Sequence, residues 1–399
     1  MAMIKLAKRS MCTGCMACSD ACRPSALTIK VMADGHYYPS IDNDKCIECG
    51  QCVKACPLNH LSQHASSFAP KTMAAWSDVE EYRETSSSGG VFPTIAKHII
   101  DNGGYVIGAY MESSIARHIV ISDSKDISKL QGSKYQQSDT RGIYKQCKDL
   151  LNDNKTVLFS GTPCQVAGLC AYLKRPYSNL ITIDVICAGV PSRLVIDRYK
   201  AICPDAQIIS YRNKRDGWGG LHITSLEKGC QVIESTNGKI LGDSIAGHQT
   251  DRYSCYNCQF VGITRCADIT IGDFWGGDAY FPEQKKKGIS VIIVRTKEAE
   301  TILKDAGVTT HQVPLINAIN KNPRIIYGKR PFARLRLERR LMKWLIPRLP
   351  YRTYASLYAG AYTKKQHFPI KLYRWFLWRL ETRKSKTQVS KIINKYNEY

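Results

Sequence analysis

Within the first sixty residues, one spacing of cysteines occurs twice. Intervals of two, two and three residues separate the four cysteines of each copy. The copies are Cys12, Cys15, Cys18 and Cys22, and Cys46, Cys49, Cys52 and Cys56. In two-cluster proteins, three cysteines of one copy hold a cubane cluster and the fourth ligand comes from the other copy. The motif therefore predicts two [4Fe-4S] clusters, one bound by Cys12, Cys15, Cys18 and Cys56 and the other by Cys46, Cys49, Cys52 and Cys22.

Zinc is the alternative metal for cysteines at this density. Zinc ribbons, however, use two separated CxxC pairs and not a duplicated run of four cysteines. The segment between the two copies reads as two short strands around Asp34-Gly35. Residues 1–60 are therefore expected to form a small α+β ferredoxin domain of the bacterial type.

The total number of cysteines also favours metal over disulfides. The chain has 17 cysteines in 399 residues, an odd number, and eight of them fall within residues 12–56. Such density in a reducing compartment is typical of metal binding. No apolar stretch follows the basic N-terminus, and no run of about 18 apolar residues occurs, so neither a secretory signal nor a transmembrane helix is expected. We therefore expect a cytoplasmic protein of two or three domains.

Strand-like and helix-like segments alternate in the middle of the chain. The strand-like segments are 73–76, 105–111, 156–160, 180–186 and 269–271, and the helix-like segments include 91–102, 141–154 and 191–202. This alternation predicts an α/β domain with a largely parallel sheet. We expect a linker at 61–72, the α/β domain at 73–328 and a helical basic tail at 329–399.

Seven short motifs accompany this pattern. They are SSSGGVF (86–92), QGSKY (131–135), GTPCQ (161–165), DVIC (184–187), GVPS (189–192), CYNC (255–258) and DITIGDFWG (268–276). With the cysteine repeat, they resemble the beta subunit of coenzyme F420 hydrogenase/dehydrogenase in its form with an N-terminal two-cluster ferredoxin domain. The resemblance covers about residues 1–328 and implies a flavin, FAD, and further iron-sulfur chemistry in the second domain.

Two of these motifs are candidates for flavin contacts. Ser87, Ser88, Gly89 and Gly90 stand just before a helix-like segment, where small residues and free backbone amides can bind phosphate. Gly132, Ser133, Lys134 and Tyr135 form a similar group, in which the lysine would pair with a phosphate and the tyrosine would stack on or flank the ring system. The alternatives are an ordinary turn for the first motif, and a solvated lysine with a core tyrosine for the second.

Four further cysteines are candidates for a third [4Fe-4S] cluster. Cys164 and Cys187 follow strand-like segments, and open α/β sheets place ligand sites at the carboxyl ends of their strands. Cys255 and Cys258 form a CxxC pair. In the family these positions match cluster ligands near the flavin, so the resemblance implies a site made of Cys164, Cys187, Cys255 and Cys258. The alternatives are buried structural cysteines with a redox or zinc pair, and Cys266 is close enough in sequence to replace one ligand.

A flavin beside iron-sulfur clusters connects one-electron transfer with the reduction of an organic molecule. The resemblance suggests three substrates: the deazaflavin coenzyme F420, a conjugated double bond, or an unidentified substrate from polysaccharide biosynthesis. The main hypothesis is a flavin-dependent oxidoreductase that exchanges electrons with a donor or acceptor protein. The alternatives are a non-catalytic electron-transfer subunit and a scaffold of polysaccharide assembly. No catalytic residue is assigned, because His222, Asp243, Asp251 and Asp273 are candidates by residue type only.

The net charge of +23 is concentrated in the tail, where residues 329–399 hold 19 Lys and Arg against 3 Asp and Glu. Segments 334–346 and 370–383 mix these cations with Leu, Trp, Tyr and Phe, a composition typical of helices on anionic membrane surfaces. The alternatives are a helical subdomain packed on the body and a docking surface for an acidic partner. No nucleic-acid-binding motif occurs, so nucleic acid is not an expected partner.

Overall fold

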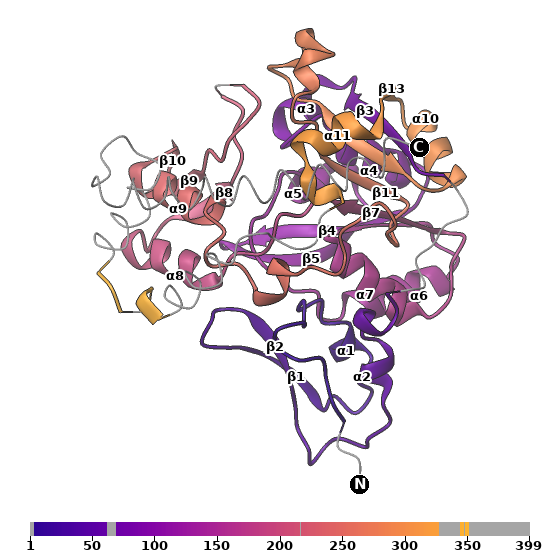
Figure 1. Ribbon diagram of the computed structural model, residues 1–399, viewed down its shortest axis with the longest axis vertical. Helices are drawn as coiled ribbons and strands as arrows, with labels where there is room; N and C mark the ends of the chain where they lie inside the picture. Colours follow the sequence, from indigo (N-terminus) through magenta and orange to yellow (C-terminus); the bar gives the residue numbers. More distant parts are fainter. Residues whose placement is uncertain (1–3, 62–68, 216, 327–343, 347, 351–399) are drawn as a thin grey trace.

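The computed structural model describes residues 4–61, 69–215, 217–326, 344–346 and 348–350. Most of the expected linker and nearly all of the expected tail lie outside these residues, so the tail's helices and its membrane contact stay predictions. A small N-terminal domain packs under a larger α/β domain, as Figure 1 shows. This arrangement confirms the ferredoxin-like domain followed by an α/β domain. In the described part of the chain, no helix has the length and apolar character to cross a bilayer.

The N-terminal domain contains one hairpin and two short helices. Strands β1 (Leu27–Val31) and β2 (Tyr37–Ile41) pair antiparallel around the expected turn. Gly35 in that turn has φ +72°, a conformation that favours glycine. Helices α1 (Ala17–Asp20) and α2 (Gln51–Lys54) each lie within one copy of the cysteine repeat.

The α/β domain is built on an eight-stranded sheet with the order β13-β3-β12-β11-β7-β6-β4-β5. These strands are β3 (Lys71–Ser77), β4 (Tyr105–Glu112), β5 (Ile115–Ile121), β6 (Val157–Gly161), β7 (Leu180–Val185), β11 (Ile269–Asp273), β12 (Ser290–Val294) and β13 (Val308–Gln312). Among the described strands, parallel pairing occurs only between β11, β7, β6 and β4. The expectation of a largely parallel sheet was therefore wrong: antiparallel strands complete both edges, which makes the sheet mixed.

Helices cover the two faces of this sheet. Helices α4 (Val91–Asp101) and α10 (Lys297–Asp305) pack on one face, where residues such as Ile95 and Leu303 are buried. Helices α6 (Ile143–Asn152) and α7 (Pro163–Leu173) pack on a second core, which also includes Cys15 of the N-terminal domain. The second core therefore joins the two domains.

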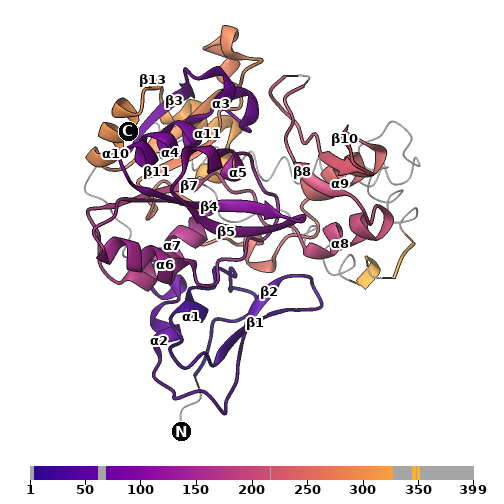
Figure 2. The same ribbon diagram turned by 180° about the vertical axis from the view of Figure 1, so that it is seen from behind.

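A second, three-stranded antiparallel sheet forms a lobe beside the main sheet. It contains β8 (Gln207–Ser210), β9 (Thr224–Glu227) and β10 (Cys230–Ile233), and it shares a core with α8 (Arg193–Ile202) and α9 (Thr236–Ala246). Figure 2 shows this lobe from behind, set apart from the main sheet. The alternating pattern predicted α8 but not this separate sheet.

Candidate iron-sulfur and cofactor sites

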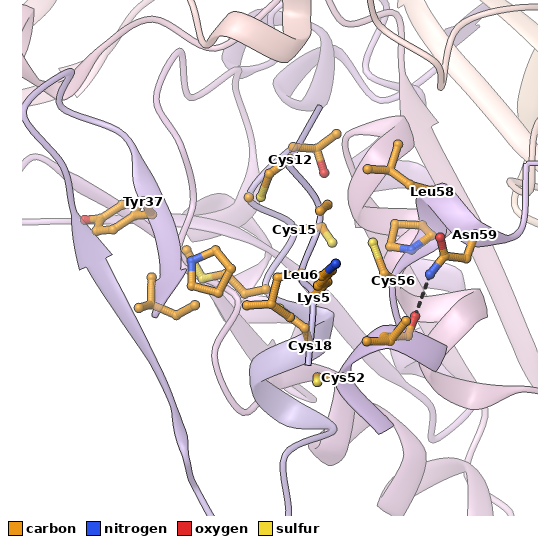
Figure 3. A pocket seen from close by; sticks show the side chains of 18 residues that line it. Lys5, Leu6, Cys12, Cys15, Cys18, Tyr37, Cys52, Cys56, Leu58 and Asn59 are labelled. Carbon is orange, nitrogen blue, oxygen red and sulfur yellow. Dashed lines mark hydrogen bonds between the residues drawn. The ribbon is translucent and has the colours of Figure 1, made fainter. Parts of the chain in front are cut away.

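The first group of cysteines surrounds a cavity in the N-terminal domain. Cys12, Cys15, Cys18 and Cys56 line a cavity of about 250 Å³, to which Cys52 also contributes. Figure 3 shows these side chains around the same space, with apolar neighbours such as Leu6 and Leu58. Burial, together with the nearby Cys12 and Cys56, raises the pKa of the Cys15 thiol to about 12. An apolar cavity between four sulfur donors fits a thiolate-bound cluster, whose formation requires the thiols to lose their protons.

The second group is formed around α2. Burial raises the pKa of Cys52, and the charges of Cys22 and Cys49 add to this effect, so these three thiols are close neighbours. Cys46 lies on the same loop as Cys49 and is half-buried, whereas Cys49 is exposed. Cys52 also raises the pKa of Cys18, which belongs to the first group. The two groups are therefore adjacent.

A third group brings together the cysteines of the second domain. Cys164 begins α7 and Cys187 follows β7, so both lie at the carboxyl edge of the parallel strands. Burial raises the pKa of Cys164, and the charges of Cys258 and Cys187 contribute. Burial, with the charges of Asp251, Cys187 and Cys258, raises the pKa of Cys255 to about 12. The four half-buried cysteines are therefore close enough for their charges to act on one another.

The sequence GTPCQ explains how Cys164 reaches this position. Thr162 and Gln165 form a capping box at the N-terminus of α7, with Pro163 in the first turn. The Thr162 hydroxyl lies 3.2 Å from the Cys164 sulfur. A helix N-terminus favours the thiolate, which is the form that binds metal.

Cys266, considered as a replacement ligand, lies elsewhere. Its pKa is raised by a hydrogen bond with Cys170 and by burial, and both residues pack with the core around α6 and α7. In the described residues, no three His, Cys, Asp or Glu side chains are placed to hold a single metal ion. Ligands of a four-iron cluster bind different iron atoms and stand farther apart than ligands of one ion.

Helix α7 connects the first and third groups. A Cβ atom added at Gly168 would lie 3.1 Å from the Cys15 sulfur, so the helix backbone closely approaches the first group. The hydroxyls of Tyr144 and Thr140 each donate to the Cys15 carbonyl over 2.7 Å. The Cys15 charge also contributes to raising the pKa of Cys164. These contacts place the two groups beside the same helix.

A carboxylate of the N-terminal domain fixes the same interface. Asp20 at the end of α1 accepts hydrogen bonds from the backbone amides of Gly142, over 2.7 Å, and Tyr144, over 3.0 Å. These amides stand at the N-terminus of α6, where a negative charge is favourable. Asp20 therefore caps a helix of the other domain.

The first proposed flavin loop is tied to the sheet. The Ser88 hydroxyl donates to the Ile289 carbonyl over 2.9 Å. A Cβ atom at Gly89 would lie 2.6 Å from the Ala75 carbonyl oxygen, which only glycine avoids. Gly90 has φ +79° and precedes α4. These residues thus have structural roles in joining β3, β12 and α4.

The second loop lies against the first. The Ser133 amide donates to the Ser87 hydroxyl over 2.9 Å. The Lys134 ammonium donates to the Gln131 carbonyl over 2.6 Å, and burial lowers its pKa to about 7. Tyr135 packs edge-on against Tyr211, with ring centroids 5.7 Å apart.

A cavity of about 620 Å³ opens beside the second loop, lined by Gly132, Ser133 and Lys134. Seven Lys and Arg side chains line it against three Glu. The cations are Arg83, Lys134, Arg212, Lys214, Arg215, Lys286 and Lys287. Burial, with the charges of Arg83 and Arg212, lowers the pKa of Lys214 to about 7. The cavity therefore has the size and charge for an anionic ligand.

Sequence reasoning missed Arg83, Arg212 and Lys214, which lie far apart in the chain. Arg212 forms an ion pair of 2.6 Å with Asp273 at the carboxyl end of β11. Asp273 also accepts a hydrogen bond from the Trp218 indole over 2.9 Å. Of the four acid candidates, Asp273 thus lies nearest this cavity, and the motif DITIGDFWG contained the signal.

The other acid candidates lie in the second lobe and the loop that follows it. His222 is 3.2 Å from Glu234, and Asp251 is 3.1 Å from His248. Asp243 lies within α9, and burial raises its pKa. None of the three lines the cationic cavity among the described residues.

Comparison with known families found three matches along the chain. Residues 11–60 match a 4Fe-4S dicluster domain. Residues 72–143 match the N-terminal part, and residues 154–314 the C-terminal part, of the coenzyme F420 hydrogenase/dehydrogenase beta subunit. The dicluster match confirms an iron-sulfur domain that holds at least one cluster.

Curated relatives match only the N-terminal domain. The ferredoxin-type protein NapF of Escherichia coli K12 is 31% identical over 48 residues, 12% of this chain and 29% of that protein. NapF of Haemophilus influenzae is 34% identical over 50 residues, 12% of this chain and 28% of that protein. The chain thus spans less than a third of the length of these relatives.

The comparison also found a solved structure that aligns with part of the chain. It is a chain of the F420-reducing [NiFe] hydrogenase complex from Methanosarcina barkeri, studied by xenon derivatization. The match has a TM-score of 0.43 and 15% identity, and it covers 66% of this chain and 90% of that chain.

Proposed function

Because the chain belongs to the coenzyme F420 hydrogenase/dehydrogenase beta subunit family, we propose that it is an iron-sulfur flavoprotein oxidoreductase. In this proposal it moves electrons between a partner protein and an organic substrate or deazaflavin coenzyme. One observation carries the proposal: Cys164 and Cys187 follow β6 and β7, and Arg212 of the cationic cavity pairs with Asp273 at the end of β11, so the third group and the cavity share the carboxyl edge of the parallel strands. Reduction of a substrate from polysaccharide biosynthesis is one form of the same function.

Twelve cysteines would hold the three clusters. Cys12, Cys15, Cys18 and Cys56 would hold the first, Cys22, Cys46, Cys49 and Cys52 the second, and Cys164, Cys187, Cys255 and Cys258 the third. The types of ligand support this assignment, since every proposed ligand is a cysteine sulfur. Burial disfavours a free thiolate at these positions and raises the pKa of Cys15, Cys164 and Cys255. Such clusters supply one-electron transfer.

The contacts around α7 support transfer between the first and third groups. The charge of Cys15 contributes to raising the pKa of Cys164, and the backbone at Gly168 allows van der Waals contact with Cys15. Tyr144 holds the Cys15 carbonyl and fills the space beside the helix. These residues would fix the distance and exclude water between the two sites.

The cationic cavity would hold FAD, or its phosphates, near the third group. A flavin would accept electrons one at a time and transfer two of them to an organic molecule. Arg83, Arg212 and Lys214 would neutralise an anionic group. Lys134, with the backbone amide of Gly132, would position it at the cavity wall, to which Ser133 also contributes. Ser87, Ser88, Gly89 and Gly90 would support that wall from behind, whereas Tyr135 would act through its contact with Tyr211.

The test is to purify the chain without oxygen and to quantify iron, sulfide and flavin in one sample. We expect about twelve irons and one FAD per chain, together with reduction of the flavin when dithionite reduces the clusters. About eight irons without flavin would refute the third site and the catalytic role. That result would support a non-catalytic electron-transfer subunit, an alternative favoured by the resemblance of the N-terminal domain to ferredoxin-type proteins.

A further inference from the structure

Arg252 is a buried cation that contacts the first group of cysteines from the second domain. Arg252 is completely buried, with 0% of its surface exposed. Its Nε donates to the Cys12 carbonyl over 2.7 Å, and its Nη2 lies 3.5 Å from the Cys12 sulfur. Its backbone amide donates to the Val190 carbonyl, and the short helix that carries Cys255 begins at the next residue. Arg252 thus links the first group to the segment that supplies part of the third.

No carboxylate in the described part of the chain pairs with this guanidinium. Its other partners are the Gln137 side-chain oxygen, at 3.1 Å, and the Tyr38 ring, whose centroid lies 4.1 Å away. Arginine keeps its charge in proteins, and a buried charge without an opposite charge is strongly unfavourable. The partner able to provide that opposite charge is the thiolate of Cys12.

The backbone beside Cys12 is shaped around the guanidinium. Gly14 has φ +72°, and a Cβ atom there would lie 2.7 Å from the Arg252 Nη1 and 2.1 Å from the Gln137 amide nitrogen. The same Gln137 nitrogen donates to the Gly14 carbonyl over 3.1 Å. Any other residue at this position would therefore push the arginine and the glutamine away from the cysteine loop.

We propose that Arg252 is a positioning residue that raises the reduction potential of the cluster held by Cys12, Cys15, Cys18 and Cys56. The inference rests on the cluster assignment of the proposed function. When that cluster accepts one electron, its negative charge increases by one, and a fixed positive charge beside a ligand sulfur stabilises the reduced form more than the oxidised form. Hydrogen bonding to the sulfur acts in the same direction.

The test is a dithionite titration of the anaerobically purified full-length protein, followed by electron paramagnetic resonance at defined potentials. The variants are Arg252→Gln, which removes the charge, and Arg252→Lys, which keeps it. We expect Arg252→Gln to lower the ratio of reduced to oxidised first cluster at least tenfold at a fixed potential, a shift of about 59 mV for one electron. Arg252→Lys should change this ratio less than threefold.

Arg295→Gln is the matched control, because Arg295 is also buried and its guanidinium donates to the Ile263 and Ala267 carbonyls and to the Thr270 hydroxyl. It should leave the potentials of all clusters unchanged. If Arg252→Gln fails to hold the first cluster while Arg252→Lys is fully loaded, the result supports the proposal, since the charge is then what the cluster requires.

Two results would overturn the proposal. One is an unchanged potential in a fully loaded Arg252→Gln protein, and the other is equal loss of the cluster from both variants, which indicates a packing role without dependence on charge. Iron quantification of the wild-type protein separates these results from a failure of the proposed function. A wild-type chain without clusters refutes that function, and the Arg252 proposal with it.

Discussion

Substitution of Gly168 by alanine has two opposing effects on the stability of the protein. Gly168 lies inside α7, and replacing a helical glycine by alanine stabilises a helix by about 1 kcal/mol. The added Cβ, however, would lie 3.1 Å from the Cys15 sulfur, 3.2 Å from the Cys15 Cβ and 3.3 Å from the Tyr144 hydroxyl. Cys15 cannot move away easily, because it is buried and its carbonyl accepts two side-chain hydrogen bonds.

Overpacking of this kind costs about 1–3 kcal/mol. With the gain in helix propensity subtracted, we expect Gly168→Ala to destabilise the protein by about 1 kcal/mol, which lowers the Tm by about 2–4 °C. The assay is calorimetric unfolding of proteins with equal iron content. The variant should also bind iron less completely in the N-terminal domain, since Cys15 is displaced.

Gly242→Ala provides the matched control. Gly242 lies inside α9, and its added Cβ would be 3.4 Å from the Leu221 carbonyl oxygen, an ordinary contact. Only the gain in helix propensity then remains, so this variant should have a higher Tm than the wild-type protein. A Gly168→Ala protein as stable as wild type, or stabilised as Gly242→Ala is, would refute the close contact between α7 and Cys15.

Three further predictions use the same protein. Cys164→Ser should lose about four irons per chain in an iron assay, whereas Cys266→Ser should lose none. Burial lowers the pKa of His118 to about 4, so its neutral form stabilises the fold above about pH 6.5, and this stability is lost as pH falls from 6.5 toward 4. Chemical denaturation should show that the free energy of unfolding falls by about 2 kcal/mol between pH 7 and pH 5. The His118→Gln variant should not show this fall. Burial and neighbouring guanidinium groups lower the pKa of Lys214 to about 7, so FAD affinity measured by fluorescence should weaken as pH rises above 7. Lys214→Met should reduce this dependence, and the part that remains should come from Lys134, whose pKa is also lowered to about 7.

Features that depend on neighbouring residues could be predicted from the sequence. The cysteine repeat and the turn at Asp34-Gly35 are local signals, and the structure has the expected hairpin and the first cavity there. The central strands were also found, because buried parallel strands form continuous apolar runs such as LITIDVI. The position of Cys187 beside Cys164 follows from the same logic, since adjacent parallel strands end at the same edge.

Features made by distant residues could not be predicted in this way. Arg83, Arg212 and Lys214 have no local motif, and only the folded chain brings them to one cavity. The antiparallel strand β12 was not among the predicted strands, and because all its residues are buried, its sequence resembles that of a parallel strand. Arg252 stands in a polar stretch, where its complete burial has no signal in the sequence.

The geometry of α7 explains why the first and third groups can be coupled at all. Cys164 and Gly168 are four residues apart, so they lie on the same face of the helix, about 6 Å apart along its axis. One turn of a single helix thus carries Cys164 of the third group and approaches Cys15 of the first group closely. The separation of the two sites is therefore set by a rigid element and does not depend on the linker between the domains. One residue inserted between these two positions would rotate Gly168 by about 100°, which would separate the sites while leaving every cysteine in the chain.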